Sequence, residues 1–310
     1  HYHPDAFCCG LLNSQPMGFY APAQIVRDAR EHGVAVLPVD VNASGWDCTL
    51  EGEGEPFALR LGLRQIDGLP EHVAAALVNA REAGGPFRDI ADLRARGGLS
   101  PAHIERLASA DAFTSLGVSR RQALWDARSL IAAPDLPLFR AMGVREEGAE
   151  RAGIALPAMP LSEEVVADYQ TTRLSLKAHP MAFLRADLGA RGFVRACDLR
   201  ARKFRSMVQV AGVVLIRQRP GSAKGVCFIT LEDETGVCNV VLWARMLEQF
   251  RREVMSARLM QVEGVIEKSA EDVVHVVARR VIDRSSELSR LSQDHDTAVQ
   301  LARADVVAHP

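Results

Sequence analysis

Residues 207–217 have the sequence Met-Val-Gln-Val-Ala-Gly-Val-Val-Leu-Ile-Arg, a Val-rich run typical of a long β-strand. Four further strand-like runs and one helical run follow, at residues 225–231, 237–243, 246–255 (the helix), 259–266 and 273–282. Strand, strand, strand, helix, strand, strand is the order of an OB barrel. The acidic turn at residues 231–236, which a glycine closes, fits the connection between the second and third strands. We therefore predict an OB-fold β-barrel over residues 201–285.

The alternation of side chains along two of these strands predicts which face of the barrel is open to a ligand. Apolar residues share one parity in each strand and are expected to point inward. The inward set is Cys227, Ile229, Leu231, Cys238, Val240 and Leu242. Outward aromatic side chains beside basic residues make a stacking platform for single-stranded nucleic acid. We predict that this platform consists of Arg217, Arg219, Lys224, Phe228, Asn239 and Trp243. An alternative is that Trp243 only caps the barrel beneath the helix that follows it.

The distribution of charge supports a polyanionic partner. The formal net charge of the whole chain is -2, but residues 191–230 contain nine Lys or Arg and a single acidic residue, Asp198. Such a split within one chain is typical of a segment that binds nucleic acid.

Glycine-containing turns between helices recur in residues 66–113. The first joins Gly68 and Leu69 to a helix that starts after Pro70, and the second joins residues 97–99 to a helix with Ser100 as N-cap. Two helix-hairpin-helix units in tandem present backbone N–H groups to DNA phosphates without reading bases. We predict contacts from Gly68, Leu69, Gly98, Leu99 and Ser100. The alternative is that the first hairpin is structural only, because Pro70 has no N–H.

The remaining segments organise the chain around these two modules. A helix ending near Asn13, a helix at residues 23–32 and strands at residues 34–41 and 59–66 precede the hairpins. Residues 134–160 are rich in Pro, Gly and charge and are expected to form a linker. A short apolar peptide in this linker suits docking into a partner's groove. Its residues are Asp135, Leu136, Leu138 and Phe139.

No catalytic or metal-ligating residue is assigned. The acidic residues 232–234 are adjacent in a tight turn, so we expect a solvated hairpin tip rather than a metal site. Residues 221–225 contain Gly-Ser-Ala-Lys-Gly, which is too short for a phosphate-binding loop and precedes a strand. We therefore expect no cofactor in this chain.

Composition indicates a soluble, cytoplasmic protein without a membrane segment. The longest apolar run, residues 210–216, is far shorter than the roughly 20 residues that cross a bilayer. The six cysteines include no C-x-x-C pair, which favours reduced thiols. Because the chain opens at His1, within a helical pattern, we expect it to be part of a longer protein.

Several long strings of this sequence resemble the bacterial family C DNA polymerases, most closely the error-prone, damage-inducible branch. They are residues 2–4, 13–20, 25–30, 37–42, 174–181, 217–225 and 231–236. The chain departs from the family at Arg173, where glycine is more frequent. It also departs at Asp135, where the family's sliding-clamp-binding motif has glutamine.

The resemblance implies an α+β multidomain fold. Its parts are the end of the polymerase fingers (residues 1–50), a tandem helix-hairpin-helix module (51–132), a linker and connecting helix (133–200), the OB domain (201–285) and a polar tail (286–310). The implied function is translesion synthesis and repair, with the hairpins on the duplex backbone and the OB domain on the single-stranded template. The implied partners are primer-template DNA, the sliding clamp and other damage-induced mutagenesis proteins.

The family's catalytic aspartates bind Mg²⁺ in a domain that would lie before His1, so this part alone is expected to be inactive. A competing hypothesis is a stand-alone accessory protein that binds single-stranded DNA. A third is an anticodon-type OB domain of a tRNA enzyme, which the hairpin module disfavours.

Overall fold

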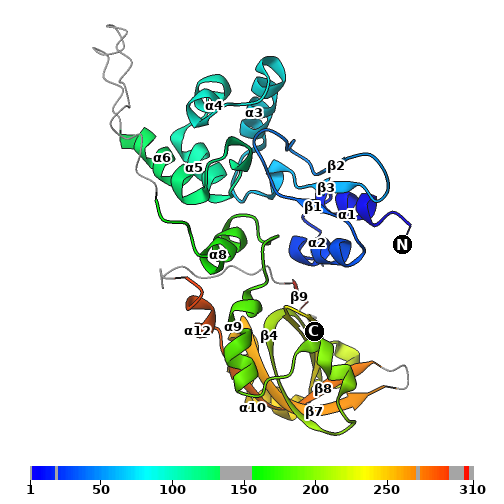
Figure 1. The fold of residues 1–310 in the computed structure, drawn as a ribbon. Coiled ribbons are helices and arrows are strands. Elements are labelled where there is room, and N and C mark those ends of the chain that lie inside the picture. Colours follow the sequence, from blue (N-terminus) through cyan, green and yellow to red (C-terminus); the bar gives the residue numbers. More distant parts are fainter. Residues whose placement is uncertain (1, 18–19, 133–155, 270–272, 293–303, 307–310) are drawn as a thin grey trace. The chain divides into compact units, whose positions relative to one another are not determined.

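The computed structural model describes residues 2–17, 20–132, 156–269, 273–292 and 304–306 (Figure 1). These residues belong to two compact units, one of residues 1–15 and 25–160 and the other of residues 16–24 and 161–310. The proposed peptide Asp135, Leu136, Leu138 and Phe139 lies outside the described residues.

The first unit combines a small sheet with helices. Its elements are α1 (Pro4–Asn13), the part of α2 (Pro22–Glu31) from residue 25 on, β1 (Val36–Leu37), β2 (Thr49–Glu51), β3 (Ala58–Arg60), α3 (Glu71–Gly84), α4 (Ile90–Gly97), α5 (Pro101–Ser109) and α6 (Arg120–Ala132). The strands are shorter than predicted, since β1 ends before Pro38, which has no N–H to donate to a sheet. Residues 63–65 form a 3₁₀ turn, so the predicted strand at 59–66 is also wrong in its second half.

The two hairpins owe their geometry to local capping. Gly98, with φ of 61°, ends α4 in the left-handed region. The side chain of Ser100 accepts a hydrogen bond from the N–H of His103, and Pro101 opens α5, as the sequence predicts. The fully buried Leu93, Ile104 and Leu107 then pack the helices together.

The second unit contains a closed β-barrel (Figure 1). Its strands are β4 (Met207–Gln218), β5 (Cys227–Asp233), β6 (Gly236–Leu242), β7 (Leu259–Lys268) and β8 (Val274–Asp283). They follow the order β5-β6-β8-β7-β4, and β4 closes the barrel by pairing with β5. Only β6 and β8 run parallel within the barrel, a topology that confirms the predicted OB fold. β9 (Ala304–Val306) pairs in parallel with β4 outside this barrel.

Helices pack against the barrel at several places. The expected helix at 246–255 is divided into α10 (Ala244–Gln249) and α11 (Arg251–Ser256), whose Val254 packs into the barrel core. Outside the barrel, α8 (Leu161–Thr171), α9 (Pro180–Ala190) and α12 (Ser286–Ser289) share a second apolar cluster with Ala211 and Val213 of β4. The connecting helix expected before the barrel corresponds to α8 and α9, and buried Leu288 and Leu291 also belong to this cluster.

A β-bulge in β4 turns one predicted DNA-binding residue into the protein. The register shifts between Val214 and Ile216, so Leu215 is the extra residue and Arg217 lies opposite inward-facing Ile229. Arg217 is only 7% exposed. Its Nε donates to the carbonyl O of Val254 at 2.6 Å, and its Nη2 donates to the carbonyl O of Ala257. The prediction that Arg217 belongs to the basic rim is therefore wrong, because it binds the carbonyls at the end of α11.

Replacing Arg217→Met is expected to destabilise the second unit by about 2–4 kcal/mol, because two buried carbonyls lose their donor. Arg219→Met is the matched control, since Arg219 is exposed and no ion pair is described for it. Thermal melting followed by circular dichroism should show a lower Tm, by several degrees, for the first variant alone. Equal melting of the two variants would contradict the structural role of Arg217.

Candidate nucleic-acid interface

The outward face of β5 and β6 presents two aromatic side chains. Phe228 pairs with Val241 across the two strands, and Trp243 follows at the end of β6. Phe228 is 39% exposed and Trp243 is 56% exposed. The predicted outward parity of both residues is confirmed. The alternative that Trp243 caps the barrel is wrong, because α10 leaves most of this residue in solvent.

A polar row lies beside the aromatic side chains. Thr230 pairs with Asn239, and Thr230 Oγ1 is 3.5 Å from Asn239 Oδ1. Across the parallel pairing, Asn239 neighbours His275 of β8. Nδ1 of His275 is buried and has no hydrogen-bond partner within the described part of the chain. Sequence reasoning missed His275 because the pairing of β6 with β8 joins residues far apart in the chain.

The loop between β4 and β5 supplies the cations of this face. Arg219 and Lys224 are both exposed, and neither forms an ion pair among residues that the structure describes. Lys224 and Gly225 adopt successive positive φ values of 49° and 83°, which turn the chain into β5. Burial raises the pKa of the nearby Cys227 thiol, although the charges of Arg217 and Arg219 oppose this effect. Cys227 is therefore an inert core thiol.

The acidic hairpin is a structural brace, so the predicted solvated tip at residues 232–234 is wrong. Asp233 is 5% exposed. Its Oδ2 accepts the N–H of Ala196 at 2.8 Å and Nη2 of Arg185 at 3.1 Å. Arg185 Nε also lies 2.5 Å from Glu234 Oε1. These carboxylates fasten α9 and the segment after it to the hairpin of β5 and β6.

The hairpins of the first unit expose backbone and bury leucine side chains. Gly68 and Gly98 are exposed, with φ of 70° and 61°. Leu69 and Leu99 are each 5% exposed, so their side chains anchor the turns in the core rather than face a ligand. Ser100 is exposed and caps α5. The first turn of a helix leaves backbone N–H groups without intrahelical partners, and phosphates bind at such helix starts.

Arg106 is a candidate residue that sequence reasoning missed. It lies on α5 of the second hairpin, yet its Nη1 donates to the carbonyl O of Asp67 in the first hairpin at 3.2 Å. A Cβ at Gly68 would come within 1.9 Å of this Nη1, so the glycine makes room for the guanidinium. Arg106 is exposed and forms no ion pair in the described residues. A cationic donor thus stands at the turn where Pro70 lacks an N–H.

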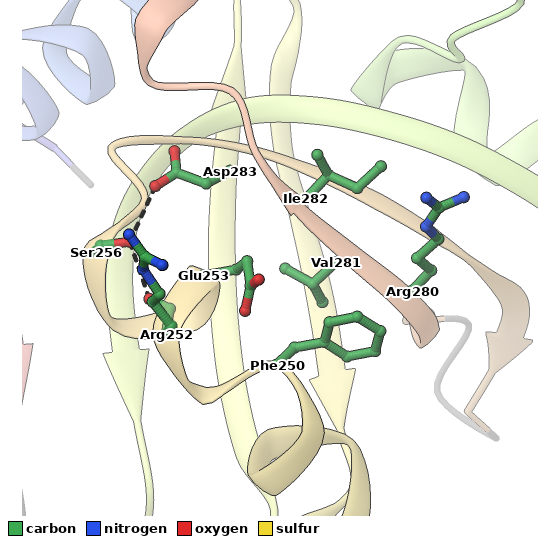
Figure 2. Close-up of a pocket in the computed structure, with 8 residues that line it drawn as sticks. All are labelled: Phe250, Arg252, Glu253, Ser256, Arg280, Val281, Ile282 and Asp283. Carbon is green, nitrogen blue, oxygen red and sulfur yellow. Dashed lines mark hydrogen bonds between the residues drawn. The ribbon is translucent and has the colours of Figure 1, made fainter.

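A separate groove of about 670 Å³ lies between α11 and β8 (Figure 2). Its lining is Phe250, Arg252, Glu253, Ser256, Arg280, Val281, Ile282 and Asp283. Burial disfavours ionisation of Asp283, but hydrogen bonds from Ser285 and Ser256 outweigh this effect and hold its pKa below the ordinary value. Two cations and two carboxylates line the groove, so its charge favours neither anionic nor cationic ligands.

Two negative findings concern the residues that the structure describes. Within these ranges, no group of three or more His, Cys, Asp or Glu side chains is placed to hold a metal ion. No described helix combines the length and the apolar character needed to cross a membrane.

Two family models match the chain at the modules described above. One, described as a helix-hairpin-helix motif, matches residues 33–123. The other, described as an OB-fold nucleic acid binding domain, matches residues 208–283. A solved asparaginyl-tRNA synthetase from Pyrococcus horikoshii aligns with 29% of this chain and 22% of its own, at 21% identity and a TM-score of 0.26, which supports no conclusion.

Curated relatives match over nearly the whole chain. The error-prone DNA polymerase of Rhodopseudomonas palustris (strain ATCC BAA-98 / CGA009) is 51% identical over 312 residues, covering 94% of this chain and 26% of the relative. The error-prone DNA polymerase of Brucella abortus biovar 1 is 50% identical over 310 residues, covering 100% of this chain and 28% of the relative. The chain thus spans just over a quarter of the length of these relatives. Over this matched part the chain is similar to error-prone DNA polymerases, and it corresponds to the C-terminal part of these longer proteins.

Proposed function

We propose that this chain is the DNA-holding part of a polymerase that acts in translesion synthesis and repair. In this proposal the barrel binds the single-stranded template and the hairpins bind the duplex backbone. The observation that carries it is the pair of exposed aromatics, Phe228 and Trp243, beside the unpaired cations Arg219 and Lys224. The names of the relatives, error-prone DNA polymerases, support a role of this interface in DNA synthesis.

The barrel face suits a single strand better than a duplex. Aromatic rings exposed on a sheet stack on unpaired bases, whereas the bases of a duplex already stack on each other. Arg219 and Lys224 lie on the loop that leads into the strand of Phe228, where phosphates of a stacked strand would pass. Stacking contributes about 1–3 kcal/mol per base and accepts any base, since every base has a π face.

The hairpins suit the backbone of a duplex. Gly68, Gly98, Ser100 and Arg106 are exposed there. Backbone N–H groups, hydroxyls and guanidinium groups are the donors that bind phosphate oxygens. Buried Leu69 and Leu99 hold the two turns in place without reaching a base edge. Such contacts fix position on DNA and carry no sequence information.

Phe228→Ala and Trp243→Ala are each expected to weaken binding of a fluorescein-labelled oligo-dT by roughly ten-fold, because each removes one stacked base. Fluorescence anisotropy titration measures the dissociation constant. Met255→Ala is the matched control, since Met255 is 56% exposed but lies on α11. Affinities that stay unchanged in both aromatic variants would exclude this face as the binding site.

Removing the cations should change the salt dependence instead. The double variant with Arg219→Met and Lys224→Met is expected to lower the slope of log affinity against log salt by about 1.4, at roughly 0.7 per phosphate contact on a single strand. Arg217→Met should leave this slope unchanged, because the buried guanidinium touches no phosphate. A slope that falls in the Arg217 variant and not in the double variant would contradict the assignment.

Duplex binding should depend on Arg106. Arg106→Gln is expected to reduce the salt slope for a blunt duplex by about 0.9, which is the loss of one contact on B-DNA. Arg27→Gln is the control, because Arg27 is held by Glu31 on the surface of α2. An unchanged slope for Arg106→Gln would show that Arg106 links the two hairpins but binds no phosphate.

We also propose that the carboxylates for nucleotide transfer lie in the part of the relatives that this chain does not cover. Phosphoryl transfer needs positioned metal ions, which such carboxylates hold. The purified chain is therefore expected to give no extension of a labelled primer with Mg²⁺ or Mn²⁺, as judged on a denaturing gel. Extension products that persist after further purification would show that catalytic residues are present here.

A further inference from the structure

A β-bulge in β8 turns two consecutive arginines outward. The register of β8 with β7 shifts between Ala278 and Arg280, so Arg279 is the extra residue of the bulge. Burial follows this shift, because Ala278 and Val281 belong to the barrel core whereas Arg279 and Arg280 are both exposed. A regular strand would turn one of two consecutive side chains inward, so the bulge is what exposes both.

The neighbouring strand makes room for this bulge. Gly264 of β7 pairs with Ala278, the last residue before the bulge. A Cβ at Gly264 would lie 2.5 Å from the carbonyl O of Val277, so a larger residue there would push β8 away. Bulges often aim a side chain at a functional surface, which makes Arg279 a candidate for a ligand contact.

The parallel pairing of β6 with β8 brings Arg279 next to Trp243. Val241 pairs with Val277, and neither residue belongs to the apolar cluster inside the barrel. Two residues further along the two parallel strands, and therefore on the same outward side, come Trp243 and Arg279. Neighbouring strands lie about 4.8 Å apart, so a single strand spacing separates the two backbones.

The helix that follows Trp243 agrees with this placement. α10 starts directly after Trp243, at Ala244, and it contacts β8. Phe250, at the other end of α10, lines the groove together with Arg280 and Val281 (Figure 2). The chain therefore runs beside β8 from Trp243 to Phe250, with Trp243 at the end nearer the bulge.

The two arginines of the bulge differ in their charge partners. Nη1 of Arg280 lies 3.8 Å from Oε1 of Glu263. Arg279 forms no ion pair within the part of the chain that the structure describes. Trp243 is 56% exposed, so an open ring and an unpaired cation stand side by side. These are the two groups that a single strand needs, one for a base and one for a phosphate.

We propose that Arg279 binds the phosphate of the nucleotide whose base stacks on Trp243. The contact extends the DNA-binding face from β5, β6 and their loop to a third strand, β8. This inference rests on the proposed function, because it adds one phosphate contact to the single strand that the barrel face holds. Arg280 takes no part in it, since Glu263 already holds its guanidinium.

The salt dependence of oligo-dT binding tests this contact. Arg279→Met is expected to lower the slope of log affinity against log salt by about 0.7, the share of one phosphate on a single strand. If the affinities converge near about 1 M salt, binding at about 0.1 M is roughly five-fold weaker. Arg279→Lys keeps the charge and should keep the slope. Arg280→Met is the matched control and should leave the slope unchanged, because Glu263 already neutralises that charge.

A double-mutant cycle tests whether Arg279 and Trp243 hold the same nucleotide. Without the indole, the nucleotide no longer stacks beside Arg279 and its phosphate is no longer held in place. In the Trp243→Ala background, Arg279→Met should therefore weaken binding by only about two-fold or less. Equal losses from Arg279→Met in both backgrounds would overturn the shared nucleotide.

The outcomes separate this inference from the function on which it rests. If Phe228→Ala and Trp243→Ala weaken binding while Arg279→Met changes neither affinity nor slope, the inference is wrong and the proposed function stands. An equal loss of slope in Arg280→Met would also overturn it, because any cation at this end of β8 would then suffice. If the unmodified chain binds no oligo-dT, the proposed function of the barrel fails first.

Thermal melting provides the control for folding. Arg279→Met should melt at the temperature of the unmodified chain, since this side chain is exposed and forms no ion pair in the described residues. A melting temperature that falls together with the affinity would assign Arg279 a structural role instead.

Discussion

Closure of the barrel depends on β4, which pairs with β7 along its first half and with β5 along its second. One strand can serve both neighbours only if it bends, and two features allow this. Gly212 lets the backbone of Glu232 approach, because a Cβ there would lie 2.7 Å from that residue's carbonyl O. The bulge at Leu215 then increases the local twist. The same bulge sends Arg217 inward, where it ties the end of α11 to the strand.

The acidic hairpin between β5 and β6 also holds the segment before β4 in place. Asp233 binds the N–H of Ala196 and the guanidinium of Arg185, so α9 and the chain after it are fixed to β5 and β6. That chain leads directly into the exposed residues 202–205. Buried carboxylates stabilise a fold only when their hydrogen bonds are satisfied, and Asp233 meets this condition with several donors. A structural ion network therefore determines where the exposed cations stand.

The sequence predicted what depends on neighbouring residues and missed what depends on distant ones. Alternation along β5 and β6 is local, so the outward positions of Phe228 and Trp243 were predictable, as was the cap at Ser100. The apolar run of β4 has no alternation, so the bulge that buries Arg217 left no signal. Arg185 is 48 residues from Asp233, and Arg106 is 39 residues from Asp67, so neither contact has a sequence pattern. Leu288 and Leu291 are buried in the second apolar cluster. Two leucines are too short an apolar pattern to distinguish a packed helix from a polar tail.

The arginines of this chain fall into two groups that composition cannot separate. Arg185 is paired with carboxylates and Arg217 donates to backbone carbonyls, and both are largely buried, so neither guanidinium is free to contact a phosphate. Arg205 and Arg219 are exposed, so their positive charges attract anions in solution. Salt at 0.1 M screens this attraction beyond about 10 Å. An interface made of such cations and of aromatic faces recognises the backbone and the π surface of any base. In the proposed function this indifference to base identity is an advantage, because a template-holding surface that read base edges would reject the altered bases that translesion synthesis must pass.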